Sequence, residues 1–252
     1  MIRLNRAVAF KACKSGAIIV LCTVLLISLI IDPIAIHAAE YRGMEVKEGS
    51  IITLGQIEND GDKKEDIEWR ILHIESADEN KNGKNLALLL SEKVLVCMPY
   101  SLEAGDVDWE SSHARSWLNS YFPEQFFSDS EFEDICEVEL ENKGNSHYKS
   151  TEEDRKNNEK STKDKIFLLS EEEVKEYLPD LKDRKAVATD SAKEDDIFVS
   201  EISEGSFWWL RTGGEETTDC MCVGAEGGIV LSGYPAVRSD FGFRPAVYLM
   251  LD

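Results

Sequence analysis

The sequence has few of the residues from which common catalytic and metal sites are built. Only four histidines occur among 252 residues, and they are scattered along the chain. No two cysteines have the C-x-x-C spacing of a standard zinc site. There is no G-x-S-x-G, H-E-x-x-H or phosphate-binding glycine motif. We therefore expect no metal and no cofactor, we name no catalytic residue, and the sequence favours a protein that is not an enzyme.

Basic residues are also scarce. The chain has 28 Lys and Arg against 49 Asp and Glu, which gives a net charge of −21. Residues 1–39 contain four basic residues and one acidic residue, net +3, so residues 40–252 carry −24. A surface of this charge repels nucleic acid and anionic membranes and attracts cations or basic partners. Nucleic acid is therefore excluded as a partner.

Long apolar runs are missing except near the N-terminus. There the basic residues Arg3, Arg6, Lys11 and Lys14 precede an uncharged apolar run at residues 17–31. This order is typical of a secretory signal peptide, and the run is shorter than the roughly 20 residues of a transmembrane helix.

We interpret residues 1–39 as a signal peptide, with an uncleaved membrane anchor as the alternative. Cleavage is expected after Ala38 or Ala39. Both readings place the rest of the chain outside the cell or on its surface, and only this segment contacts the membrane.

Four cysteines follow this segment: Cys97, Cys136, Cys220 and Cys222. Export permits disulfides, and four cysteines allow three complete pairings, among which the sequence does not choose. On a strand, Cys220 and Cys222 would share one face, which disfavours a bond between them.

The order of hydrophobic patterns predicts an α+β domain, because strands come first, helices follow, and strands return. We expect a mostly antiparallel twisted sheet with two or three short helices. Residues 40–48 are a short polar segment, 49–252 form a single globular domain, and 141–165 are a mobile charged insertion. A helix is predicted at residues 111–119, where three apolar side chains share one face, and capping boxes at Ser128 and Ser170 predict two more helix starts. Strands are predicted at residues 51–54, 67–74, 86–96, 166–169, 207–210, 229–231 and 243–249.

Aromatic residues near the C-terminus supply the candidate binding site. In a strand, Trp208 and Trp209 point to opposite faces, so one is expected in the core and the other can be exposed. Arg211 follows them, and Arg244 lies further along the chain. An exposed indole beside an arginine would stack on a ring or hold a planar acidic group. The alternative is that both indoles pack in the core and both arginines pair with internal carboxylates or carbonyls.

Six blocks of sequence stand out in order along the chain: residues 67–70, 87–93, 115–119, 164–170, 208–211 and 242–246. Together they resemble the bacterial family known as domain of unknown function 6273. This family is typical of exported or surface proteins of gut Clostridia and their relatives. The resemblance runs from about Gly49 to the C-terminus, and the charged insertion and the pair Cys220 and Cys222 look like departures from the family pattern.

The C-terminal part has a more distant similarity to the formylglycine-generating and C-type-lectin-like superfamily. It lies in the tryptophan-rich strand and the terminal Gly-Phe-Arg segment, and it implies a twisted, looped antiparallel sheet with two helices. Lectin activity does not carry over, because the Glu-Pro-Asn sugar motif is absent. The resemblance implies that Cys220 and Cys222 would bind copper for thiol oxidation, although their spacing is tighter than in that family.

Three functions follow from these patterns. The first is a non-catalytic binding module at the cell surface for a glycan, a peptide or a surface protein. The second is an oxidase of the formylglycine-generating type. The third is a structural domain of a surface assembly with no small ligand.

Overall fold

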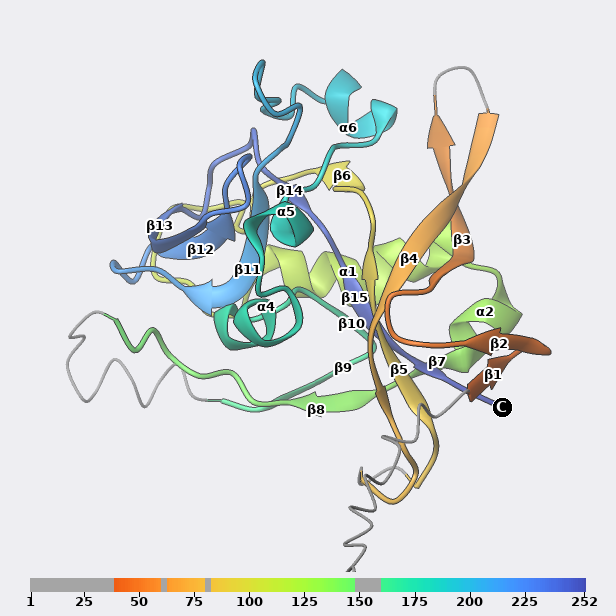
Figure 1. The fold of residues 1–252 in the computed structure, drawn as a ribbon. Helices are drawn as coiled ribbons and strands as arrows, with labels where there is room; N and C mark the ends of the chain where they lie inside the picture. Colours follow the sequence, from red (N-terminus) through yellow and green to blue (C-terminus); the bar gives the residue numbers. More distant parts are fainter. Residues whose placement is uncertain (1–38, 60–62, 80–82, 148–159) are drawn as a thin grey trace, which may run out of the picture. The chain divides into compact units, whose positions relative to one another are not determined.

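The computed structural model describes residues 39–59, 63–79, 83–147 and 160–252 (Figure 1). All of the predicted signal peptide or anchor except Ala39 lies outside the described residues. So does the middle of the predicted insertion, residues 148–159. Among the residues that are described, no helix is long and apolar enough to cross a membrane.

The larger sheet is antiparallel and has the strand order β10-β15-β5-β4-β3, with β7 also paired to β15. Its strand β5 is buried along its whole length. A strand covered on both faces needs a continuous apolar sequence, and Leu-Ala-Leu-Leu-Leu provides one. The strands are β3 (Ile51–Asn59), β4 (Lys63–Glu75), β5 (Leu86–Ser91), β7 (Ile135–Cys136), β10 (Ile166–Phe167) and β15 (Ala246–Met250).

The second sheet has the order β13-β12-β11-β14-β6. Its pairs are antiparallel except β11 with β14, which are parallel. The chain passes from this sheet into the larger one at Arg244 and Pro245, between β14 and β15. The strand predicted at 243–249 is therefore broken at Pro245. The strands are β6 (Val96–Cys97), β11 (Trp208–Gly213), β12 (Asp219–Val223), β13 (Ile229–Pro235) and β14 (Gly242–Phe243).

Two short hairpins complete the strands. The first joins β1 (Ala39–Tyr41) to β2 (Met44–Val46), and Tyr41 and Val46 are buried in the core. The segment 40–48 therefore packs onto the domain. The second pairs β8 (Val138–Leu140), which ends just before the predicted insertion, with β9 (Thr162–Asp164), which lies within its C-terminal end.

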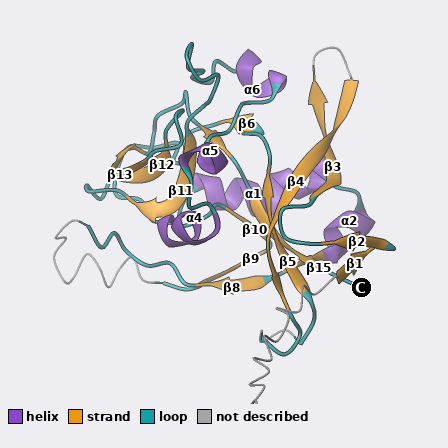
Figure 2. Ribbon diagram, viewed as in Figure 1, coloured by secondary structure: helices purple, strands orange, loops and turns teal. Residues whose placement is uncertain are grey.

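The helices lie around the sheets (Figure 2). The capping boxes predicted at Ser128 and Ser170 are both confirmed, and they start α2 and α4. Ser112 caps α1 by accepting a hydrogen bond from the Arg115 N–H. The helices are α1 (His113–Phe126), α2 (Asp129–Asp134), α4 (Glu171–Tyr177), α5 (Leu181–Arg184) and α6 (Asp190–Glu194).

The structure confirms an α+β domain with mostly antiparallel sheets and few helices, although more helices are present than the two or three expected. The described residues form five helices, and α1 spans 14 residues. The unpredicted helices α5 and α6 have four and five residues, too few for a 3.6-residue pattern to show. Tertiary contacts hold them, such as the bond from the Thr189 hydroxyl to the Leu95 carbonyl.

Candidate functional site

Trp208 and Trp209 are both 0% exposed, so neither provides the exposed indole that the sequence left open. The Trp208 Nε1–H donates to the Arg184 carbonyl at 3.0 Å, and the Trp209 Nε1–H donates to the Met98 carbonyl at 3.2 Å. Their strand β11 lies inside its sheet between β12 and β14, and both of its faces are covered. The alternative in which both indoles pack in the core therefore holds for Trp208 and Trp209.

Arg211 and Arg244 are also buried, and their partners are internal. Arg211 makes a two-pronged ion pair with Glu173 and donates to the Leu168 carbonyl at 2.9 Å. Arg244 lies over the Trp208 ring and donates to the Ser91 carbonyl at 2.8 Å. Burial lowers the pKa of Arg244 to about 10. Both guanidinium groups therefore lie in the interior of the domain and donate to internal acceptors, as the core alternative expects.

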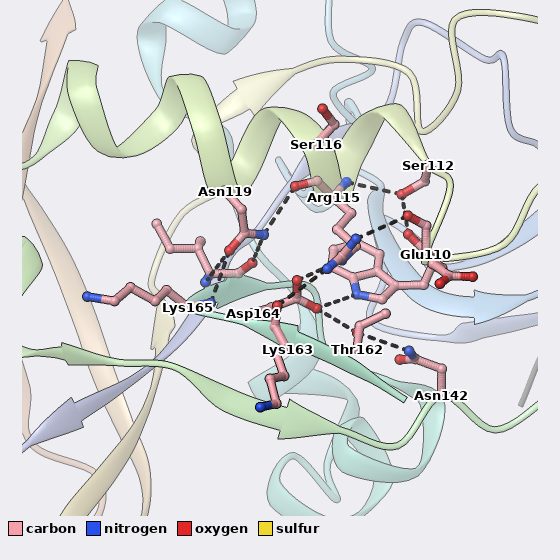
Figure 3. A network of polar contacts seen from close by, with 12 residues as sticks. Glu110, Ser112, Arg115, Ser116, Asn119, Asn142, Thr162, Lys163, Asp164 and Lys165 are labelled. Atoms are coloured by element: carbon pink, nitrogen blue, oxygen red, sulfur yellow. Dashed lines mark hydrogen bonds and ion pairs between the residues drawn. The ribbon is translucent and has the colours of Figure 1, made fainter. Parts of the chain in front are cut away.

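A buried carboxylate, Asp164, organises a polar network beside α1 (Figure 3). Its Oδ1 accepts from the Arg115 Nε–H at 2.7 Å. Its Oδ2 accepts from the Trp109 indole at 2.9 Å and from the Thr162 hydroxyl at 2.7 Å. Four polar groups that burial would otherwise penalise are thus satisfied together.

The network extends in two directions. On α1, Asn119 donates to the Ile166 carbonyl at 2.8 Å and accepts from the Lys165 N–H at 3.0 Å. On the other side, Asn142 donates to the Thr162 hydroxyl at 3.1 Å and accepts from the Arg211 Nε–H at 3.2 Å. The blocks 115–119, 164–170 and 208–211 are therefore connected through hydrogen bonds.

The model of the family described as "Domain of unknown function (DUF6273)" matches residues 84–251. The chain belongs to this family. The match begins after the block at residues 67–70, so the family region is shorter than the stretch from Gly49 that the resemblance covered. No curated protein and no solved structure matches the chain.

The Asp164 network and both buried arginines lie inside the DUF6273 region. Because these side chains use their hydrogen bonds on one another and on the main chain, we interpret five of the six blocks as residues that define the fold. A ligand site has to be sought elsewhere on the domain. The five are residues 87–93, 115–119, 164–170, 208–211 and 242–246.

The cysteines of the described residues are all free thiols. Cys220 and Cys222 are buried on β12, and burial raises the pKa of both thiols well above its ordinary value. The thiolate is the form that binds metals and attacks substrates. Burial therefore disfavours the chemistry that an oxidase would ask of this pair.

A pocket of about 600 Å³ opens in the DUF6273 region between β8 and α4. Alternate residues along β8 and its flanks put Glu137, Glu139 and Glu141 into the lining. The facing helix α4 contributes Glu172, Glu173 and Glu176. The remaining lining residues are Glu75, Leu86, Val138, Leu140, Lys143, Lys163, Ser170, Arg211 and Tyr248.

The lining has seven glutamates and three basic residues, so its charge is strongly negative. Glu172 pairs with Lys143 at 2.9 Å, and Glu173 pairs with Arg211. In the part of the chain that the structure describes, the other five glutamates form no ion pair with a Lys or Arg. They are Glu75, Glu137, Glu139, Glu141 and Glu176.

Two tyrosines have pKa values raised in part by these glutamates: Tyr248, which lines the pocket, and Tyr177, which follows Glu176 on α4. Burial raises the pKa of Tyr177 to about 12, with Glu176 and Glu173 adding to the effect. Burial and the nearby Glu75 also raise the pKa of Tyr248. An ionised phenol is disfavoured here first by burial and then by the nearby carboxylates.

The glutamates are spread along the pocket. Across the described residues, no three His, Cys, Asp or Glu side chains gather closely enough to hold a metal ion. An arrangement of separated carboxylates matches a ligand whose positive charges are themselves separated.

Sequence reasoning missed this pocket, although a local signal for one wall was present. Residues 137–141 read Glu-Val-Glu-Leu-Glu, which is the alternation of a strand with one acidic face. We placed residue 141 at the start of an unstructured insertion instead. The second wall, on α4, comes to face the first only in the folded domain.

Proposed function

We propose that this protein is an exported binding module that holds an organic cation in the glutamate-lined pocket between β8 and α4. The observation that supports this most directly is the excess of unpaired acid. Among the described residues, five lining glutamates have no ion pair, whereas Lys163 is the one lining cation without an ion pair.

The size of the pocket suits a small ligand or part of a peptide, since binding cavities commonly measure about 300–1,000 Å³. A hydrogen bond between ammonium and carboxylate is stronger than one between neutral groups. Single exposed ion pairs contribute only about 0–1 kcal/mol, so useful affinity requires several contacts at once. A pocket with several separated carboxylates offers them.

The shared chemistry of the ligand is an alkyl chain with ammonium groups. A free polyamine and the lysine side chains of a basic peptide both have it. Of the ligands expected from the sequence, a peptide or a basic surface protein fits this charge. A neutral glycan would leave the five carboxylates unpaired, and the indole expected to stack with it is buried.

The extracellular location is part of the same proposal and is supported by the N-terminal charge and hydropathy pattern. Intact mass of protein from the medium and membrane fractions of the native host, with and without thiol alkylation, tests it. A soluble form that starts at Ala39 or Glu40 would support a signal peptide, and a full-length membrane form would support the anchor. Full-length protein confined to the cytoplasm would overturn export.

The lectin-like fold and the formylglycine-type oxidase rest on resemblance alone, and the burial of Cys220 and Cys222, which raises the pKa of both thiols, argues against the oxidase. The structural-domain alternative has the Asp164 network in its favour, because the family blocks serve the fold. It predicts that the pocket binds nothing.

Calorimetric titration of the domain with spermidine, a lysine-containing peptide and a neutral oligosaccharide tests the binding proposal. We expect both cations to bind and the sugar not to bind. Which cation binds tighter distinguishes a free polyamine from a peptide. Failure of both cations would overturn the proposal and favour the structural domain.

Charge-neutral variants locate the site. Glu139→Gln with Glu141→Gln removes two exposed pocket carboxylates and is expected to weaken spermidine binding about fivefold to tenfold. The matched control is Glu45→Gln with Glu201→Gln, which removes two exposed glutamates outside the pocket lining. Equal losses in both double variants would show that net charge alone attracts the cation.

A further inference from the structure

One cation already occupies the glutamate wall of the pocket, and it belongs to the protein itself. The Lys143 Nζ lies 2.9 Å from Glu172 Oε2, so the side chain reaches from the segment after β8 to the helix α4. The two side chains are 60% and 63% exposed. An ion pair this exposed is weak and opens readily.

The main chain around Lys143 is held more firmly than its side chain. Asn142 donates to the Lys160 carbonyl at 2.6 Å, and Asn145 donates to the Leu231 carbonyl at 3.1 Å. His147 Nε2 lies 2.7 Å from Glu171 Oε1 at the start of α4. Residues 142–147 therefore keep Lys143 beside the pocket whether or not its ammonium remains on Glu172.

We propose that Lys143 is an internal stand-in for the ligand: its ammonium occupies Glu172 in the free protein, and a primary ammonium of the ligand displaces it. This inference rests on the proposed function and narrows it, because it names the group that the pocket selects. The preferred ligand bears primary ammonium groups, as lysine and polyamines do.

The chemistry of Lys143 explains this choice of group. A primary ammonium is a compact charge with three N–H donors, whereas a guanidinium is a flat fork and a trimethylammonium has no donor. A ligand that replaces Lys143 must supply at least one N–H to Glu172 at the same place. A lysine peptide should therefore bind about tenfold tighter than its trimethyllysine counterpart, because a charge-assisted hydrogen bond is lost in the latter.

Removal of the internal competitor should raise affinity. Lys143→Met keeps the length of the side chain and deletes its ammonium, and we expect spermidine and the lysine peptide to bind about threefold to fivefold tighter. Lys163→Met is the matched control, since Lys163 lines the same pocket but forms no ion pair with any residue that the structure describes. It should raise affinity less than twofold. Both lysines are exposed on the surface, so neither change threatens the fold.

Titrations of the whole domain separate the possible outcomes. Equal gains in the two lysine variants would show that Lys143 acts only through its charge and would overturn the inference, while the proposed function would stand. Equal binding of lysine and trimethyllysine peptides would also overturn it. If neither the unchanged protein nor Lys143→Met binds any cation, the proposed function itself fails.

Discussion

At the scale of single residues, the least replaceable polar group is Asp164. Its side chain is fully buried, and it accepts hydrogen bonds from Arg115, Trp109 and Thr162. Asp164→Asn would turn an amide N–H₂ toward at least one of these donors and leave Arg115 without its carboxylate. Breaking a buried ion pair costs about 3–5 kcal/mol, but Arg115 is partly exposed, so we expect a loss of about 2–3 kcal/mol in unfolding free energy.

Urea denaturation followed by tryptophan fluorescence measures this loss. The control is Glu110→Gln, which removes an exposed ion pair to Lys160 and should cost no more than about 1 kcal/mol. Similar stabilities for the two variants would show that solvent reaches Asp164 and that the network is not structural.

Residue patterns predicted which way the side chains of the first candidate site point, but not whether those side chains are buried. Alternation along β11 does place Trp208 and Trp209 on opposite faces, as expected. Which faces are covered depends on neighbouring elements that are distant in the sequence, and both faces proved to be buried. The partners of the arginines also depend on distant parts of the sequence. Glu173, which forms the ion pair with Arg211, lies 38 residues away from it.

At the scale of elements, the turn between β12 and β13 is fixed by contact with α5. Gly227 has a φ of +85°, and a Cβ there would lie 2.0 Å from the Leu181 carbonyl oxygen. Gly227→Ala therefore combines backbone strain of about 1–2 kcal/mol with a clash against main-chain atoms. We expect a total loss of about 3–5 kcal/mol in unfolding free energy.

Gly43→Ala separates the two contributions. Gly43 has a similar φ of +75°, but no atom lies within 4 Å of the position of its Cβ. That variant should lose only about 1–2 kcal/mol when both proteins are compared by chemical denaturation. Equal losses would mean that the turn moves away from α5 at little cost.

Elements with a local signal were predictable, and those made by tertiary pairing were not. The starts of α2 and α4 followed from their capping boxes, since the hydroxyl and the glutamate are three residues apart. The strands β8 and β9 are three residues each and pair across a long stretch of chain. Only β8 has a local signal, the short alternation at residues 137–141, and β9 has none. The pocket shares this origin, because its two walls belong to β8 and α4.

At the scale of the whole molecule, the chain passes back and forth between the two sheets. The charge is distributed unevenly along it. Residues 40–252 carry −24, a net charge that already counts the basic partners of ion pairs such as Arg115 with Asp164. Repulsion among the remaining carboxylates opposes the compact state. Salt shortens the range of that repulsion: the Debye length is about 30 Å at 0.01 M salt and about 10 Å at 0.1 M salt.

The melting temperature of residues 40–252 should therefore rise by a few degrees between about 10 mM and 200 mM NaCl, because screening weakens exposed repulsion more than it weakens buried ion pairs. Differential scanning fluorimetry measures this shift. Spermidine at constant ionic strength should add a further rise that saturates, since a ligand that binds the folded state stabilises it by mass action. A melting temperature that falls with NaCl would show that attraction between charges outweighs repulsion in this domain. In that case the unpaired glutamates of the pocket would have to be balanced by nearby positive charge, which would also weaken the case for a cationic ligand.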